Sequence, residues 1–231
     1  MTMSATKASA PPAHHPLEEA LVEYAGGTTR GSGALAFACH VSLCDVCARR
    51  LAGLEAVGGA LLDGAPAQAL ESGALERAME GLDAAGAAEP ELPALPAFLT
   101  HYRLPRPLER AVAALPGRVR WRFGAPGVRT IDLSSPAHAG DEARVRLVAF
   151  KPGVVIPPHD HEGTEHIVIF TGAIEEEGRR LARGDIATRE RGERHEQRIA
   201  AGEPCIALVV NEGPLVPLTL RGRLLLAFAR G

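Results

Sequence analysis

The stretch GVVIPPHDHEGTEHIVIFTG, residues 153–172, combines closely spaced histidines with a run of β-branched and aromatic residues. His159 and His161 are two residues apart, so on an extended strand their side chains point to the same side of the sheet. Glu165 follows four residues later, and His195 lies further along the chain. If neighbouring strands bring these side chains together, three imidazoles and one carboxylate form a metal site that suits Zn, Mn, Fe or Ni.

The sequence around this stretch has the spacing of short strands. Val145, Leu147 and Ala149 alternate with Arg144, Arg146 and Val148. Further apolar runs, bounded by Gly, Pro or charged residues, lie at 167–170, 207–210, 218–220 and 224–228. Several short strands separated by such turns predict an all-β sandwich or barrel for the C-terminal half of the chain.

The first part of the chain has helical spacing instead. Apolar residues recur every three or four positions from residue 17 to 24, and Gly26 and Gly27 are expected to end this first helix. A short segment at 35–36 and helices at about 40–57 and 70–82 are expected to follow, with another helix at 107–115. A bundle of about 70 residues has a thin core that usually needs reinforcement.

His40, Cys44 and Cys47 are candidates for that reinforcement. On one continuous helix, at about 100° per residue, the three side chains would leave within an arc of about 60°, which suits a shared tetrahedral Zn²⁺. Cys39 would lie about 100° away from His40 and is the poorest candidate. The fourth ligand would be His14 or His15. The alternative is a redox Cys-x2-Cys or a pair of buried thiols, although the added histidine favours metal.

The composition of the chain argues against several classes of protein. The chain has 25 basic and 28 acidic residues, a net charge of −3, which argues against a broad phosphate-binding surface. Its 4% aromatic content argues against stacking on single-stranded nucleic acid. No apolar run approaches the roughly 20 residues of a membrane span, and the start of the chain lacks the apolar core of a secretory signal. Four cysteines in this pattern do not resemble a secreted disulfide framework. We therefore expect a cytoplasmic protein with reduced thiols that binds neither nucleic acid nor membranes directly.

The charge is unevenly distributed. Residues 1–103 contain 6 basic and 12 acidic residues, a net of −6, and the remainder contains 19 basic and 16 acidic residues, a net of +3. An acidic first part would complement a basic partner, such as a DNA-binding factor, or would simply be a solvated surface.

The histidine-rich stretches resemble the two cupin motifs. They read Gly153-x5-His159-x-His161-x3-Glu165-x6-Gly172 and Gly184-x5-Glu190-x-Gly192-x2-His195, with Glu190 where the family usually has proline. The resemblance implies a cupin β-barrel (jelly roll) whose metal ligands are His159, His161, Glu165 and His195. Zn²⁺ is the first expectation for this site, and Mn, Fe or Ni also fit.

The segment His40-Val-Ser-Leu-Cys44-Asp-Val-Cys47, preceded by His14-His15, resembles the zinc-binding anti-sigma domain. In that family a helical bundle holds an extracytoplasmic-function sigma factor and blocks its access to RNA polymerase. The family's upstream histidine maps onto His15, with His14 as the ambiguous neighbour. In redox-sensing relatives the thiols form an oxidation trigger, in which case Cys39 would also matter.

The combination of the two domains resembles the ChrR family of anti-sigma factors over residues 14–231. The expected fold is multidomain, α then β: a disordered start (1–13), a zinc-stabilised helical bundle (14–85), a linker (86–104) and a cupin domain (105–231). The resemblance implies one-to-one binding of a sigma factor through the bundle. It also implies release on oxidative stress, by singlet oxygen or peroxide, sensed through the cupin metal. Metal loss, ligand oxidation and proteolysis all remain open as release mechanisms.

Two alternatives belong to other classes. The first is a metal-dependent cupin enzyme of the dioxygenase or isomerase type, with the zinc domain as an accessory. The second is a one-domain redox switch in which Cys44 and Cys47 oxidise and release zinc. The sequence assigns no catalytic residue, since His161-Glu162-x3-His166 is one residue too long for a zinc-protease motif. His166 is expected to lie at the surface or to support a ligand, Cys205 to pack as a small apolar residue, and His101 and His138 to be structural or solvated.

Overall fold

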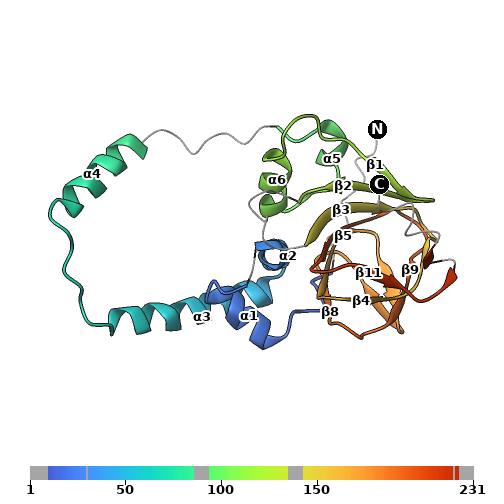
Figure 1. Ribbon diagram of the computed structural model, residues 1–231, viewed down its shortest axis with the longest axis horizontal. Helices are drawn as coiled ribbons and strands as arrows, with labels where there is room; N and C mark the ends of the chain where they lie inside the picture. The colour runs from blue at the N-terminus through green and yellow to red at the C-terminus, as the bar shows by residue number, and fades with distance from the viewer. Residues whose placement is uncertain (1–9, 30, 86–93, 135–142, 221, 224–231) are drawn as a thin grey trace.

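The computed structural model describes residues 10–29, 31–85, 94–134, 143–220 and 222–223. Figure 1 shows helices at the start of the chain, followed by a β-sandwich. In chain order the helices are α1 (Glu18–Ala25), α2 (Gly31–Val41), α3 (Asp45–Asp63), α4 (Ala74–Ala85), α5 (Ala97–Thr100) and α6 (Arg106–Ala113). The predicted order, helices and then strands, is confirmed.

The β part consists of two antiparallel sheets. One has the strand order β1-β2-β3-β10-β5-β8, and the other has the order β11-β4-β9-β6-β7. The strands are β1 (Arg122–Ala125), β2 (Val128–Asp132), β3 (Arg144–Phe150), β4 (Val155–His161), β5 (Glu165–Thr171), β6 (Ile174–Glu176), β7 (Arg179–Leu181), β8 (Ile186–Arg189), β9 (His195–Ile199), β10 (Cys205–Asn211) and β11 (Leu215–Pro217). Strands were predicted correctly at 145–149, 167–170 and 207–210, whereas 218–220 follows the last strand and 224–228 lies outside the described residues.

The prediction of a closed barrel is wrong for the part of the chain that the structure describes. Strands pair within each sheet, and the end strands of one sheet do not pair with those of the other. The two layers are held together by the side chains between them, so the architecture is a cupin-like sandwich.

The six-stranded sheet is buried on both faces. Ile167 and Ile169 of β5 point into the sandwich, whereas Val168 and Phe170 point to the opposite face. That outer face is covered by helices, and Phe37 of α2 belongs to the same core as Val168 and Phe170. Figure 1 shows α2, α5 and α6 on this side of the sheet. Because both faces are covered, the central strands are continuous apolar runs instead of alternating ones.

The helices do not form one four-helix bundle. Helix α2 packs on the sheet and against α6, and it also contacts α1 and α3, which pack against each other. Helix α4 stands apart from the rest of the molecule in Figure 1. The second part of the linker predicted at 86–104 is packed against the rest of the chain, because Leu99 and Leu104 are buried in the core beside α2. Residues 86–93 lie outside the described residues.

Among the described residues, no single helix has the length and hydropathy of a membrane span. Helices α2 and α3 reach these criteria only when taken together, and they are bent by 119° relative to each other.

Candidate metal centres

The first centre gathers His15, His40, Cys44 and Cys47. One ligand atom from each of these residues lies within 4.8 Å of the others. The Sγ atoms of Cys44 and Cys47 are 3.4 and 3.5 Å from Nδ1 of His15. His40 and both cysteines are buried, and His15 is half-buried. The four residues that the sequence brought forward therefore lie together.

The sequence predicted one continuous helix for His40, Cys44 and Cys47, but the three residues belong to two helices. His40 is in the last turn of α2, Cys44 is the N-cap residue of α3, and Cys47 is in the first turn of α3. The chain turns between the helices, where the Ser42 hydroxyl donates to the carbonyl of Ala38 and the Leu43 N–H donates to that of His40. No glycine or proline marks this turn, so it could not be predicted from the residues between the two helices.

The donor set fits Zn²⁺. The Nδ1–H of His40 donates to the carbonyl of Gly184 at 2.7 Å, which leaves Nε2 with a lone pair and, among the described residues, no hydrogen-bond partner. Burial and, to a smaller extent, the neighbouring Cys44 together raise the pKa of Cys47 to about 11. A bound divalent ion would stabilise the thiolate form of the cysteines that coordinate it.

The segment that carries His15 is attached to the β-sandwich. Asp185, which is 2% exposed, accepts hydrogen bonds from the N–H groups of Ala13 (2.7 Å) and His14 (2.9 Å). The N–H of Ile186 donates to the carbonyl of His14. His14 itself turns away from the centre, and its Nε2 donates to the carbonyl of Arg180 at 3.2 Å. Of the two histidines, it is therefore His15 that lies with His40, Cys44 and Cys47.

Gly184 makes this attachment possible. Its φ of +88° is unfavourable for residues with a side chain, and a Cβ there would lie 2.6 Å from Cγ of Pro12. The turn before β8 therefore contacts the centre twice, through the Gly184 carbonyl at His40 and through Asp185 at the segment before His15.

We expect Asp185→Ala to weaken zinc binding at this centre about tenfold or more, because the hydrogen bonds that orient a ligand segment typically contribute this much. Asp185 touches no ligand atom, so its effect would come through the position of His15. Competition with a chromogenic chelator measures the affinity. Asp63→Ala, at the exposed end of α3, is the control. Equal zinc affinity of the Asp185 variant and the wild type would contradict the prediction.

The second centre lies at one end of the sandwich. His159 and His161 are on β4, Glu165 begins β5 and His195 begins β9, directly opposite His159 in the strand register. The Nε2 of His195 is 2.9 Å from that of His159 and 3.0 Å from that of His161. The Oε2 of Glu165 is 3.6 Å from Nε2 of His161. All four residues are buried.

The second centre also fits a cation. The Nδ1–H of His159 donates to the Pro157 carbonyl at 2.9 Å, so its Nε2 carries the lone pair. Burial lowers the pKa of His159 and His161 to about 4, which leaves both neutral at pH 7. Three ring nitrogens that converge within about 3 Å on one point, with a carboxylate oxygen beside them, are the arrangement that a bound cation needs. The Oε2 of Glu165 likewise has no hydrogen-bond partner within the described part of the chain and faces the imidazoles.

Supporting residues of this centre were not predicted. The Asn211 side-chain amide donates to Oε1 of Glu165 at 2.7 Å, and Oε2 of Glu176 lies 3.3 Å from Nδ1 of His195. The Gln197 amide holds the same Glu176 oxygen at 2.8 Å. Glu176 and Asn211 come from strands outside the two motifs, and Gln197 follows the second motif on β9, so the motif spacing carried no signal for them.

Other candidates lie outside both centres. Cys39 and Cys205 are in the two hydrophobic cores, where burial raises the pKa of each to about 12. His166 is buried, not at the surface, and its ring packs edge-on against Phe37 of α2 at 5.3 Å. His101 is exposed and packs on Tyr102, while His138 lies outside the described residues. Glu190 accepts a hydrogen bond from the hydroxyl of Thr164.

Comparison with known proteins places this architecture in a family. Residues 109–216 match the model of the ChrR cupin-like domain. The anti-sigma-E factor ChrR of Cereibacter sphaeroides is 35% identical over 202 residues, which cover 87% of this chain and 91% of that protein. In the crystal structure of Rhodobacter sphaeroides SigE in complex with the anti-sigma ChrR, the matched chain superposes with a TM-score of 0.68 at 33% identity. This match covers 86% of the present chain and 98% of the matched chain. Because the similarity spans the helices as well as the sandwich, the chain belongs to the ChrR family of anti-sigma factors, which are regulators rather than enzymes.

Proposed function

We propose that this protein is an anti-sigma factor that binds an extracytoplasmic-function sigma factor one-to-one through its N-terminal helices and keeps it from RNA polymerase. The observation that carries the proposal is the similarity to ChrR, which extends over 87% of the chain and includes the helical part. The similar ChrR structure is a complex with SigE.

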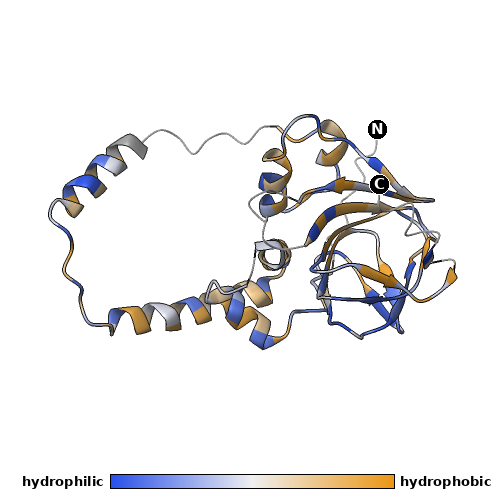
Figure 2. Ribbon diagram, in the orientation of Figure 1, coloured by the Kyte–Doolittle hydropathy of each residue, from blue (hydrophilic) through white to orange (hydrophobic). Residues whose placement is uncertain are grey.

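The helices offer a surface for such a partner. Leu75, Met79 and Leu82 lie on one side of α4, at positions i, i+4 and i+7, and each is more than half exposed. Leu61 and Leu62 near the end of α3 are exposed as well. Figure 2 shows hydrophobic colour alternating with hydrophilic colour along α3 and α4, the two helices that extend away from the sandwich. Apolar side chains gathered on a helix without a covering layer are typical of an interaction surface.

A double substitution on α4 tests this surface. Met79→Asp with Leu82→Asp should weaken sigma-factor binding about 100-fold or more, because central apolar contacts each contribute about 2 kcal/mol or more. Both side chains are exposed, so helix content and zinc content should not change. Leu220→Asp, which is 77% exposed and lies after the last strand, is the matched control. Binding kinetics and inhibition of transcription measure the effect, and an unchanged dissociation constant would exclude α4 from the interface.

We further propose that Zn²⁺ binds at His15, His40, Cys44 and Cys47 and has a structural role. Four protein ligands complete a tetrahedral shell, as in structural zinc sites. The ligands come from the segment before α1, the end of α2 and the start of α3. A zinc ion held there would fix the relative positions of three helices that have little core of their own.

We propose that the second centre, in the β-sandwich, is the sensor of oxidants. The metal would be lost from this centre when an oxidant modifies one of its ligands, which are His159, His161, Glu165 and His195. Zn²⁺ is the first expectation for this metal, and Mn, Fe or Ni are alternatives. Imidazole rings react with singlet oxygen, and a site with one ligand removed binds metal much more weakly.

Contacts between the sandwich and α2 support a route for the signal. His166 follows Glu165 on β5 and packs against Phe37 of α2. The Gly184 carbonyl holds His40, about one turn further along that helix. The division into domains at 14–85 and 105–231 and the cytoplasmic location stay predictions.

A further inference from the structure

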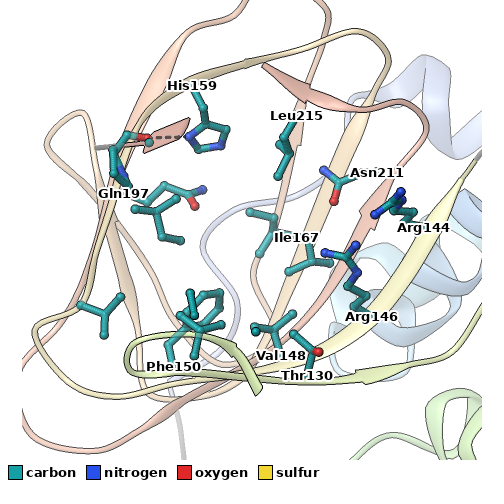
Figure 3. Close-up of a pocket in the computed structure, with 18 of the residues that line it drawn as sticks. Thr130, Arg144, Arg146, Val148, Phe150, His159, Ile167, Gln197, Asn211 and Leu215 are labelled. Atoms are coloured by element: carbon teal, nitrogen blue, oxygen red, sulfur yellow. Dashed lines mark hydrogen bonds between the residues drawn. The ribbon is translucent and has the colours of Figure 1, made fainter. Parts of the chain in front are cut away.

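A cavity of about 540 Å³ lies inside the sandwich, beside the second metal centre. His159, Glu165 and Asn211 are part of its wall, and its middle is apolar, lined by Val148, Phe150, Ile156, Ile167, Val209 and Leu215. Figure 3 shows His159 and Gln197 on one side and Asn211, Arg144 and Arg146 on the other. Enclosed apolar cavities of 300–1,000 Å³ with a few polar groups are typical of small-molecule sites.

Arg144 and Arg146 are two of the three arginines that line this cavity; Arg122 is the third, and Asp132 and Glu165 are its acidic residues. Arg144 and Arg146 are two residues apart on β3 and therefore share the face that lines the cavity. The register places Arg144 opposite Asn211 on β10, and Asn211 opposite Glu165 on β5. Two strand spacings of about 4.8 Å separate the backbone of Arg144 from that of Glu165, so the cavity reaches from the arginines to the metal centre over about 10 Å.

The two arginines have no acidic partner at contact distance. No ion pair or hydrogen bond joins either guanidinium to a carboxylate within the ranges that the structure describes. The acid nearest in register to Arg146 is Asp132, whose Oδ1 accepts the N–H of Ser134. Burial lowers the pKa of Arg146, Arg144 lowers it further, and Asp132 offsets only part of this effect. A half-buried positive charge of this kind is stabilised by an incoming anion.

We propose that this cavity binds a small organic carboxylate. Its carboxylate group pairs with Arg144 and Arg146, and its apolar chain lies along Val148, Ile167 and Leu215 towards His159. Guanidinium groups bind carboxylates through paired hydrogen bonds, and the apolar wall favours an alkyl chain over a second charged group. Such a ligand would reach the metal centre with its uncharged end. The proposal concerns the sandwich alone and does not depend on sigma-factor binding.

The test uses the full chain, purified without chelator, and two probes with the same alkyl chain. Hexanoate should bind saturably in isothermal titration calorimetry and raise the melting temperature, whereas 1-hexanol should bind at least about tenfold more weakly, because it lacks the charge-assisted hydrogen bonds. In the double variant Arg144→Gln, Arg146→Gln the preference for hexanoate should disappear. Arg198→Gln, an exposed arginine outside the cavity lining, should bind hexanoate like the wild type.

Three results would overturn the proposal. They are equal affinity for hexanoate and 1-hexanol, undiminished hexanoate binding by the arginine variant, and no saturable hexanoate binding by the wild type. Val209→Phe adds a separate check, because a ring in the cavity wall should block hexanoate while leaving both arginines in place. The metal content of each variant, measured alongside, shows that the second centre is intact.

Discussion

Cys44→Ser and His40→Ala should each remove about one zinc ion per chain and much of the helical structure of the N-terminal part. Both ligands are buried, and Cys44 begins α3 while His40 ends α2, so the loss of either would leave an incomplete shell between two helices. Zinc binding contributes on the order of 10 kcal/mol to small domains of this kind, which is more than their cores supply. Elemental analysis and circular dichroism measure the two effects.

The control for these variants lies in the same turn. Ser42→Ala removes one exposed hydroxyl and its hydrogen bond to Ala38 but no ligand, so it should keep zinc and helix content. The sandwich should stay folded in all variants, because its strands have a core of their own. Full helicity and full zinc content in the Cys44 and His40 variants would remove the structural role of zinc from the account.

The double variant His159→Ala, Glu165→Ala should still inhibit its sigma factor but should no longer respond to oxidant. These side chains face the interior of the sandwich, whereas the exposed apolar surface proposed for the partner lies on α3 and α4. Removing two of four ligands should abolish metal binding, because each lost ligand weakens such a site steeply. Reporter transcription with and without singlet oxygen or organic peroxide gives both readouts in one strain.

His101→Ala is the matched control, since it removes an exposed histidine that belongs to neither centre. It should leave both inhibition and induction unchanged. A normal induction ratio in the double variant would show that the second metal is not the sensor. It would favour the alternative in which oxidation of Cys44 and Cys47 releases the sigma factor.

The sequence predicted the second centre more accurately than the first. On a strand, side chains two residues apart share a face whatever the tertiary structure, so the orientation of His159 and His161 followed from spacing alone. His40, Cys44 and Cys47 do lie together, but not on the single continuous helix from which the sequence grouped them. The ligands approach one another because the chain turns between α2 and α3, and a turn without glycine or proline leaves little trace in the sequence.

The packing of α2 on the sandwich was not predicted, although a signal for it was present. The run from Ile167 to Phe170 is apolar at four consecutive positions, which indicates a strand covered on both faces. One cover is the other sheet, and the second had to be a helix from elsewhere in the chain. Which helix this was depended on contacts between residues more than 100 positions apart, such as Phe37 and His166, and no local pattern carries that information.

The surroundings of Arg144 and Arg146 could not be predicted from the local sequence either. Their alternation with Val145 and Leu147 gave the two faces of β3 correctly, but not the surroundings of each face. In the structure the arginines line a cavity and the apolar residues face the helices, so the charged face is the inner one. Only the second sheet, which closes the cavity, makes these arginines candidates for ligand binding.

The most direct test of the central claim is a binding measurement with the full chain against every extracytoplasmic-function sigma factor encoded in its own genome. Size-exclusion chromatography with light scattering gives the stoichiometry, and transcription by reconstituted RNA polymerase gives the inhibition. We expect one of these sigma factors to form a one-to-one complex and to lose its activity when the chain is added in equimolar amount. If no sigma factor of the set binds, or if one binds and transcribes at its full rate, the chain is not an anti-sigma factor.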